Sequence, residues 1–345
     1  MRVIKRPILT LIALILVVLT IVYIESTKPS VSRAKSESGL YPSAPEFVGI
    51  AKWINSEPLK IEELKGKVVL VDFWTYTCVN CIRTLPYLNE WYEKYKDNGF
   101  VIVGVHSPEF EFEKEYDNVL NAVEKYGIKY PVAQDNDHAT WDNYYNRYWP
   151  AEYLIDVNGN IRHFHAGEGD YEETEKLIQE LLMERMEMMN KSESLAGISK
   201  PKEVIPVDFS KVKSPEIYLG YETSRGNFGN TEGLKPEQIQ EYKLPSLTNV
   251  NKVYLEGKWK SNNDNLELVG DKGKIILEYN SKIANIVAAS DKPVDINILL
   301  DGKMYKLTVS ASQLYVAGEA EDYGDHKLEL DVLSPGFRIY TFTFG

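Results

Sequence analysis

The stretch KVVLVDFWTYTCVNC occupies residues 67–81 and leads from a nearly continuous apolar segment into two cysteines that are separated by two residues. Its first half, 67–74, is rich in β-branched and aromatic residues, which predicts a strand buried on both faces. A helix is expected to begin at Cys78. A buried strand, a turn and a helix that starts with a C-x-x-C pair are together typical of a redox site in an α/β protein.

Cys78 and Cys81 are the only cysteines of the chain, so we expect them to act as a pair. At a helix N-terminus, unpaired backbone N–H groups and the helix dipole stabilise a thiolate, which makes Cys78 the expected nucleophile. Cys81 lies one turn deeper and would resolve the mixed disulfide that Cys78 forms with a substrate. A structural disulfide across so short a loop adds little stability, and the five histidines supply no second metal-binding pair. We therefore expect a redox-active disulfide Cys78–Cys81, no metal and no other cofactor.

Asp72 is a single carboxylate among the apolar residues of the predicted strand, six residues before Cys78. A buried acid costs free energy unless it has a partner or a function. We expect Asp72 to lie beneath the cysteines and to accept the proton of Cys81 when the mixed disulfide is resolved, directly or through a water. Asp72 is therefore the third candidate catalytic residue.

The dipeptide Trp149-Pro150 precedes the predicted strand 151–156 and is a candidate for substrate binding. A cis X–Pro bond there would expose the backbone of Trp149 beside the cysteines, where an extended substrate peptide could pair with it. The other residues expected to contact the substrate are Trp74, Val79 and Asn80.

Three further residues are candidates for lining the site. Thr75 precedes Cys78 by three positions, as in peroxidases whose threonine hydroxyl polarises peroxide, so a thiol peroxidase is an alternative activity. Such enzymes also have a proline seven residues before the cysteine, and this chain has Val71 there. His106 and Glu109 follow the second predicted strand at the end of the sheet where α/β sites collect.

Three regions follow the first 43 residues. Residues 44–189 alternate apolar strands with amphipathic helices, among them 113–126 and 171–189, which is an α/β pattern. Residues 190–215 lose periodicity and gain Ser, Lys and Pro, which indicates a linker. Residues 216–345 hold roughly nine short apolar segments separated by Gly, Asn and Asp, which predicts an all-β sandwich of jelly-roll type.

The aromatic side chains of the predicted sandwich allow two interpretations. They could form a sugar-stacking platform, whereas the alternation of side chains along strands predicts that most of them pack in the core. They are Tyr218, Tyr221, Tyr254, Trp259, Tyr279, Tyr305, Tyr315, Tyr323 and Tyr340.

The N-terminal segment contains a basic start and an unbroken apolar run of 17 residues at 8–24, at the lower limit for a helix that crosses a bilayer. We expect residues 1–25 to be a single-pass signal anchor with a cytoplasmic N-terminus, and 26–43 to be a flexible tether. The later regions would then lie outside the cytoplasm, in an oxidising compartment. Cleavage after Ala34 and secretion is the alternative.

Composition excludes several classes of protein. The 43% apolar and 26% charged residues are typical of globular domains and not of disordered, collagen-like or multi-span membrane chains. The net charge is −12, and because residues 1–35 carry +5, the remainder carries −17. A nucleic-acid partner is therefore not expected.

Several motifs together resemble the thioredoxin superfamily. They are Asp72-Phe73-Trp74, the pair at 78 and 81, Pro86 eight residues after Cys78, and Trp149-Pro150 before a strand. Residues 74–110 and 130–156 are more closely similar to the exported thioredoxin-like domain of DipZ-type proteins, relatives of the TlpA reductases. The similarity continues through Tyr218-Leu219-Gly220-Tyr221 and the closing FTFG at 342–345.

This resemblance implies a thioredoxin-like domain over 44–189 and a sandwich over 216–345 that is similar to a carbohydrate-binding module, with a glycan as a further candidate ligand. It implies an exported thiol–disulfide oxidoreductase that reduces protein disulfides. DipZ-type proteins carry an electron-conducting membrane domain, whereas this sequence has a single apolar run. The electrons would therefore come from a separate membrane donor of the CcdA/DsbD kind.

Two further points bear on the substrate and on the class of protein. Thr84 stands where cytochrome-maturation relatives tend to have Glu, which does not favour an apocytochrome substrate. A fold shared with enzymes does not by itself carry function. A surface or glycan-binding protein in which the cysteine pair is incidental is therefore the alternative from another class.

Overall fold

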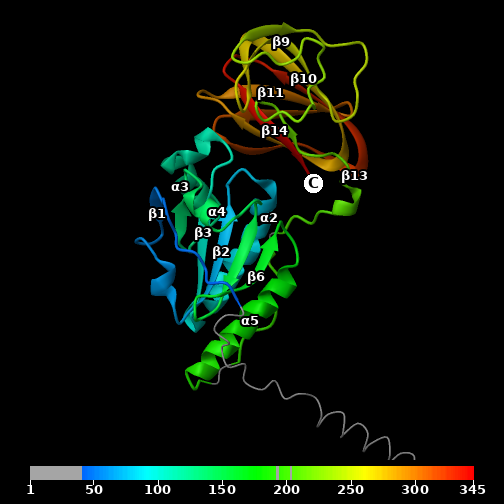
Figure 1. Cartoon of the computed structure of the whole chain (residues 1–345). Helices are drawn as coiled ribbons and strands as arrows, with labels where there is room; N and C mark the ends of the chain where they lie inside the picture. Colours follow the sequence, from blue (N-terminus) through cyan, green and yellow to red (C-terminus); the bar gives the residue numbers. More distant parts are fainter. Residues whose placement is uncertain (1–40, 192–193, 203) are drawn as a thin grey trace, which may run out of the picture. The chain divides into compact units, whose positions relative to one another are not determined.

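The computed structural model describes residues 41–191, 194–202 and 204–345. The predicted anchor and most of the predicted tether lie outside these residues. No helix in the described part of the chain is long and apolar enough to cross a membrane. An α/β region comes first and a β-rich region follows it (Figure 1).

The α/β region is built on a six-stranded sheet with the order β1-β4-β3-β2-β5-β6. Strand β2 (Val68–Trp74) lies at its centre, parallel to β3 (Phe100–His106) and antiparallel to β5 (Ala151–Ile155). All seven residues of β2 are buried, which confirms the strand predicted over 67–74. The remaining strands are β1 (Lys52–Ile54), β4 (Val132–Gln134) and β6 (Ile161–Ala166).

Side chains of β2 alternate between two apolar clusters, one on each face of the sheet. Val68, Leu70 and Trp74 belong to the cluster that contains Cys81 and the apolar residues of α2 (Val79–Tyr95), α3 (Tyr116–Lys125) and α5 (Tyr171–Met188). Val69, Val71 and Phe73 belong to the opposite cluster with residues of η1 (Ile61–Leu64) and α4 (Ala139–Asn143). Asp72 therefore faces the side of the sheet that α2 covers. The short 3₁₀ helices elsewhere are η2 (Lys96–Asn98), η3 (Glu111–Lys114) and η4 (Phe209–Lys211).

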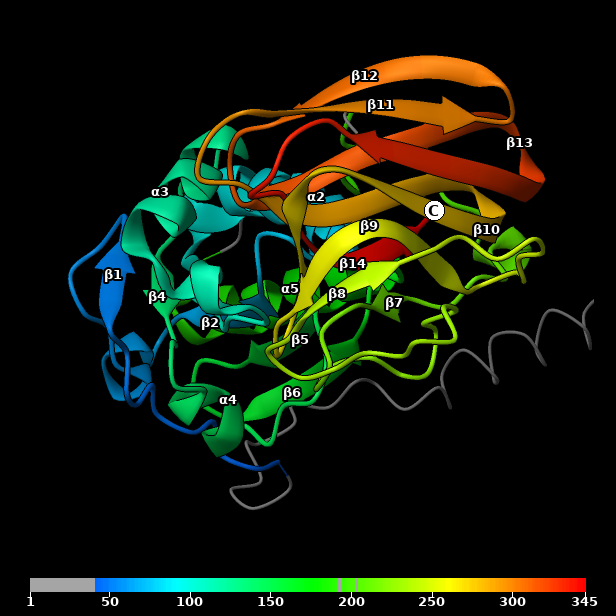
Figure 2. The same ribbon diagram turned by 90° about the horizontal axis from the view of Figure 1, so that it is seen from above.

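The β-rich region forms one hydrogen-bonded set of strands in the order β12-β11-β13-β10-β14-β7, with β9 paired to both β10 and β8. Figure 2 shows the pair β11 and β12, whose antiparallel register runs from Val294↔Val309 to Leu300↔Lys303. The bounds of its strands are β7 Ile217–Tyr218, β8 Ile239–Tyr242, β9 Val253–Ser261, β10 Leu266–Ala289, β11 Val294–Leu300, β12 Lys303–Val309, β13 Gln313–Val332 and β14 Arg338–Phe344.

Fewer and longer strands occur here than the sequence predicted. The three expected segments between residues 265 and 289 form the single 24-residue strand β10, and the segments at 313–316 and 326–332 both lie within β13. Register shifts at Ser281/Ile283 and Ala284/Asn285 accommodate irregularities without ending the β10–β13 pairing. The short strands β7 and β8 were not predicted.

Most of these aromatic residues are buried, and Trp259, Tyr279 and Tyr315 lie in the apolar core of the region, as the alternation of its side chains predicted. Trp259 and Tyr279 are fully buried, and Tyr305 differs with 43% of its surface exposed. Tyr254 is also buried, whereas Tyr218 and Tyr340 are buried in a separate cluster that includes Phe110 of the α/β region. A sugar-stacking platform built from the whole set is therefore not present.

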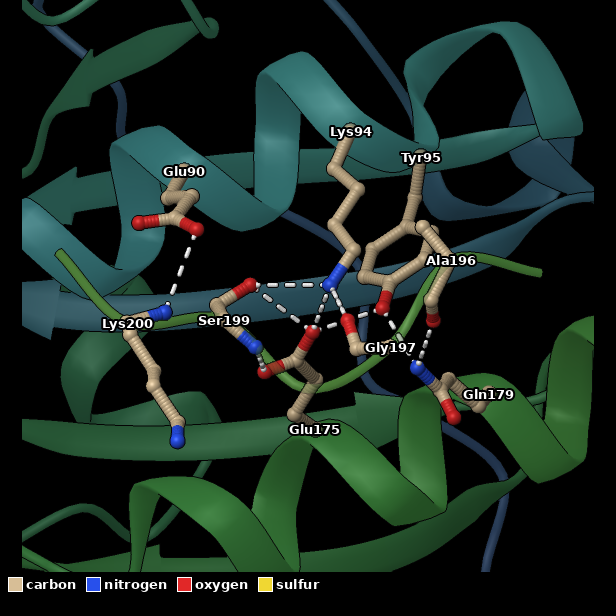
Figure 3. A network of polar contacts seen from close by, with 9 residues as sticks. All are labelled: Glu90, Lys94, Tyr95, Glu175, Gln179, Ala196, Gly197, Ser199 and Lys200. Carbon is tan, nitrogen blue, oxygen red and sulfur yellow. Dashed lines mark hydrogen bonds and ion pairs between the residues drawn. The ribbon is translucent and has the colours of Figure 1, made fainter.

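The start of the predicted linker is held against the α/β region by a buried carboxylate (Figure 3). Glu175 on α5 is 1% exposed, and its Oε1 accepts hydrogen bonds from Lys94 Nζ and Tyr95 OH of α2, each at 2.6 Å. Its two oxygens also accept from Ser199, from the amide at 2.7 Å and the hydroxyl at 2.8 Å. Lys94 donates in addition to the Gly197 carbonyl. This part of the linker is therefore tied to both helices.

Candidate active site

The cysteine pair lies where β2 passes into α2. Cys78 is the N-cap residue of α2, and its Sγ accepts a hydrogen bond of 3.3 Å from the backbone N–H of Cys81. Both cysteines are free thiols; Cys78 is half-buried and Cys81 is 1% exposed. The pair therefore presents one sulfur that a substrate can reach and one that is shielded, as the expected nucleophile and resolving thiol require.

Burial controls the acid–base properties of Cys81. It raises the pKa of the Cys81 thiol well above the ordinary value, and the neighbouring Cys78 and the charge of Asp72 raise it further. A buried thiol with a raised pKa does not ionise by itself near neutral pH. Attack by Cys81 therefore needs a group that removes its proton.

Asp72 lies on the same face of the sheet as Cys81. Its side chain is 1% exposed and faces α2, and burial raises its pKa from 3.8 to about 8. Its register partner on β3 is Gly104, which has no side chain to offer. Within the described residues, Asp72 Oδ1 has no hydrogen-bond partner. The carboxyl group thus lies in the cluster of Cys81 with one oxygen that no structural hydrogen bond occupies.

The turn before Cys78 is held by a carboxylate that the sequence did not identify. Thr77 donates a hydrogen bond of 2.5 Å from its hydroxyl to Oε1 of Glu113. Oε2 of the same residue accepts from the backbone N–H groups of Glu109 and Phe110, at 2.5 and 3.0 Å. Glu113 has no exposed surface. It therefore joins the turn before the cysteines to the segment that follows β3.

Two of the expected lining residues, Thr75 and His106, support this turn from behind. Both have no exposed surface, and the Thr75 hydroxyl lies 3.3 Å from Nε2 of His106. The imidazole stacks on Tyr76 with ring centroids 5.6 Å apart. Burial lowers the pKa of His106 to about 3, so the ring is neutral at physiological pH. Neither residue is open to a substrate in this structure.

Glu109, the third expected lining residue, is directed toward the β-rich region. Its Oε1 accepts a hydrogen bond of 2.6 Å from the hydroxyl of Tyr218 on β7. Burial raises the pKa of Glu109 to about 8, although the Tyr218 hydrogen bond opposes the shift. The guanidinium of Arg225 lies 4.6 Å from the centre of the Tyr218 ring. Glu109 therefore connects the two regions and does not line the cysteine pair.

On the β5 side of the site, the peptide bond between Trp149 and Pro150 is cis. The Trp149 indole donates a hydrogen bond of 3.0 Å to the Ser107 carbonyl and lies 4.3 Å from the Trp141 ring. Trp149 is half-buried, and the nearby Tyr148 is 53% exposed. This segment therefore combines an accessible tryptophan with a second accessible aromatic ring.

The remaining residues expected to contact substrate differ in accessibility. Asn80 is half-buried and its Oδ1 accepts a hydrogen bond of 3.4 Å from Arg83. Val79 is 8% exposed. Trp74 is fully buried, and its indole lies edge-on to His106. The expectation that Trp74 contacts the substrate is therefore not met, because alternation along β2 directs it into the core.

Two protein families match this chain, one in each region. The Redoxin family matches residues 43–182, and the family described as "Thioredoxin like C-terminal domain" matches residues 214–345. Protein DipZ of Mycobacterium tuberculosis is 36% identical over 311 residues, which cover 88% of this chain. The same match covers 43% of DipZ, so the chain spans less than half the length of that relative.

Shorter relatives match the α/β region alone. The thiol–disulfide oxidoreductase YkuV of Bacillus subtilis is 33% identical over 140 residues, which are 41% of this chain and 94% of YkuV. A solution structure of an oxidised thioredoxin-like protein is 34% identical and covers 42% of this chain and 98% of its own, with a TM-score of 0.39.

The chain belongs to the thioredoxin-like thiol–disulfide oxidoreductases. Within that class it is a homologue of DipZ, with a Redoxin domain followed by a second, β-rich domain. The expected thioredoxin-like α/β domain and the expected family are thereby confirmed.

Proposed function

We propose that the protein reduces disulfide bonds of extracytoplasmic proteins through Cys78 and Cys81. One observation carries the proposal: the half-buried Sγ of Cys78 accepts the Cys81 amide at the start of α2, while the Cys81 thiol is buried behind it. The first sulfur lies at the N-terminus of the helix, where a substrate can reach it, and the protein interior shields the second thiol. This asymmetry suits a stepwise exchange of thiols and disulfides.

The reaction proceeds in two exchanges. The Cys78 thiolate attacks one sulfur of the substrate disulfide, forms a Cys78–substrate bond and releases the other sulfur as a thiolate. Cys81 then gives its proton to Asp72 and attacks Cys78 Sγ. This second exchange releases the remaining substrate sulfur as a thiolate and leaves the Cys78–Cys81 disulfide. Two electrons pass to the substrate, and each released thiolate takes a proton from solvent.

The location and the electron source are part of the same proposal. The apolar run at 8–24 and its basic start support a single-pass anchor with the two domains outside the cytoplasm. A separate membrane donor of the CcdA/DsbD kind would then reduce the Cys78–Cys81 disulfide after each turnover. Cell fractionation tests the anchor: we expect the intact chain in the membrane fraction, and a soluble form that begins near Lys35 would contradict it.

The β-rich domain is interpreted as a jelly-roll-type sandwich, supported by its antiparallel pairings and its single large apolar core. Most of its aromatic rings are buried, so we do not propose glycan binding as a second function. Its contacts with the segment after β3 support a role in holding the active-site turn.

Mixed-disulfide trapping tests the proposed reaction. In the full chain kept in mild detergent, Cys81→Ser removes the resolving thiol, so protein partners should accumulate as adducts on Cys78. A Cys78→Ser, Cys81→Ser double variant is the matched control and should capture nothing. Equal capture by the two variants, or none by folded Cys81→Ser, would contradict a reductase acting on proteins.

A further inference from the structure

Three titratable residues lie side by side on adjacent strands at the level of Asp72. In the antiparallel pairing of β2 with β5, Asp72 is directly opposite Glu152. In the pairing of β5 with β6, Glu152 is in turn opposite His165. Directly opposed residues of antiparallel strands have Cβ atoms about 4.5–5.5 Å apart. The three side chains thus form a continuous row across the sheet.

The row faces the same side of the sheet as Cys81. On β5, Leu154 belongs to the cluster that contains Cys81, whereas Tyr153 belongs to the cluster on the opposite face. Glu152, two positions before Leu154, therefore shares the face of Cys81. Phe164 on β6 packs against Tyr153 on the other face, with ring centroids 4.8 Å apart. His165 therefore lies on the Cys81 face as well.

Exposure increases along the row from the site toward the surface. Asp72 is 1% exposed and Glu152 is 2% exposed, whereas the side chain of His165 is 16% exposed. Nδ1 of His165 lies 4.0 Å from Oδ2 of Asp170, a residue whose side chain is 72% exposed. Nε2 of His165 is buried and has no hydrogen-bond partner among the residues that the structure describes. One end of the row is thus buried in the cluster of Cys81 and the other borders solvent.

Among the described residues, no positively charged group contributes to the pKa of Asp72 or Glu152. The titratable residues that interact with the pair are Cys81 from α2, Tyr130 from the segment before β4 and Tyr171 from α5. Burial raises the pKa of Glu152 well above its ordinary value, and the charge of Asp72 raises it further. Two neighbouring buried carboxyls do not both ionise readily, because the charge of each raises the pKa of the other.

The other end of the row has its own charged neighbours. His163, Asp170 and Glu173 are the titratable groups near this part of β6 and the start of α5. His165 therefore lies at the end of the row that borders solvent, beside an exposed carboxylate.

We propose that Asp72, Glu152 and His165 form a path along which the proton of Cys81 passes across three strands to the solvent. The proposal rests on the reaction proposed above for Cys78 and Cys81. The Cys81 thiol gives its proton to the carboxylate of Asp72, Asp72 passes a proton to Glu152, and Glu152 passes one proton to Nε2 of His165. Nδ1 releases a proton to solvent, and the resulting Cys81 thiolate attacks Cys78. When the disulfide is reduced again, the proton moves along the same path inward.

Single-turnover kinetics of the full chain test the path, because formation and resolution of the mixed disulfide can be followed as separate phases with a fluorescent disulfide. His165→Ala should leave formation unchanged and slow resolution, and added imidazole should restore resolution as a mobile proton carrier. Glu152→Gln should also slow resolution, without imidazole rescue, because the interruption then lies inside the protein. Asp72→Asn should slow it most, by about 10²-fold or more.

His163→Ala is the matched control, since His163 lies on the same strand and face but opposite Leu154, an apolar residue. Its resolution rate should equal that of the unmodified chain and should not respond to imidazole. If His165→Ala resolves at the unmodified rate, or if imidazole accelerates the control equally, the path is wrong while the thiol reaction stands. If the unmodified chain forms no mixed disulfide, the proposed function fails and the path fails with it.

Discussion

The backbone N–H of Cys81 lies 3.3 Å from Sγ of Cys78 and donates a hydrogen bond to it. The donor belongs to the first turn of α2, where N–H groups have no partner within the helix. A hydrogen bond to a sulfur is strongest when the sulfur is a thiolate. The start of α2 therefore supplies a hydrogen-bond donor to the sulfur of Cys78, while the interior that surrounds Cys81 favours the neutral form of the Cys81 thiol.

The two thiols should react with alkylating reagents at very different rates. Cys78 is half-buried, whereas Cys81 is 1% exposed and its pKa is raised by burial. A short pulse of iodoacetamide on the reduced chain should modify Cys78 first and leave most of Cys81 free, as peptide mass spectrometry would show. Cys78→Ser should remove the fast phase. Equal labelling of both cysteines during the pulse would contradict the assigned roles.

Asp72→Asn should stabilise the fold and slow the reaction. Because burial raises the pKa of Asp72 from 3.8 to about 8, the folded chain holds this proton more tightly than the unfolded chain. The stability from this carboxyl is complete below pH 3.8 and is lost as the pH rises through 8. The variant lacks that loss, so its free energy of unfolding should exceed that of the unmodified chain by a growing margin, on the order of a few kcal/mol at the upper end.

Denaturant melts across this pH range and turnover assays on the same sample measure both effects. Turnover should fall by about 10²- to 10⁴-fold, less if a water substitutes for the carboxylate. Asp117→Asn on the exposed side of α3 is the control and should change neither quantity. Unchanged turnover together with lost stability would mean that Asp72 is a structural residue.

Glu113→Gln should destabilise the chain and disturb the active-site turn. Three donors, the Thr77 hydroxyl and the amides of Glu109 and Phe110, point at its two oxygens. A glutamine keeps one accepting oxygen, so at least one buried donor loses its partner at a cost of about 1–3 kcal/mol. Denaturant melts check this. Glu111→Gln, whose side chain is 79% exposed, is the control, and equal effects of the two changes would contradict the role of Glu113.

Glu175→Gln should loosen the start of the linker. Burial alone would raise the pKa of Glu175, but the hydrogen bonds from Lys94, Tyr95 and Ser199 lower it below the ordinary value, so the carboxylate is ionised in the fold. Loss of the carboxylate charge in Glu175→Gln removes charge-assisted hydrogen bonds to α2 and to the linker. Limited proteolysis within residues 194–202 should therefore become faster. Glu173→Gln, exposed on the same helix, should not change the cleavage rate. Equal protection of both variants would contradict this anchoring role.

The sequence predicted the parts of the fold whose pattern is local. Strand β2 was predicted from a run of seven residues that is apolar except at Asp72. Asn158-Gly159 correctly predicted the hairpin between β5 and β6. The predicted helix 113–126 is instead η3 and α3, separated at Glu115. The reason is that Glu113 turns inward to bind three donors, which a run of alternating Glu, Phe and Lys does not reveal.

The sequence identified candidate site residues only where a single residue differed in chemistry from its neighbours in the chain. Asp72 stood out as an acid within an apolar strand, and Glu152 in AEYLI carries the same signal. Its importance depends on the register that places it opposite Asp72, and strand pairing is a property of the tertiary structure. Glu109 follows β3 as expected, whereas His106 is the last residue of that strand. The burial of both side chains depends on packing that local sequence does not determine.

One measurement tests the central claim most directly: mass spectrometry of the cysteines after a single turnover of the reduced full chain with a small protein disulfide such as insulin. For each substrate disulfide lost, one Cys78–Cys81 disulfide should form, and Cys78→Ser should consume none. Loss of substrate disulfides while both cysteines stay reduced, or substantial activity of Cys78→Ser, would contradict the assignment of the reaction to this pair.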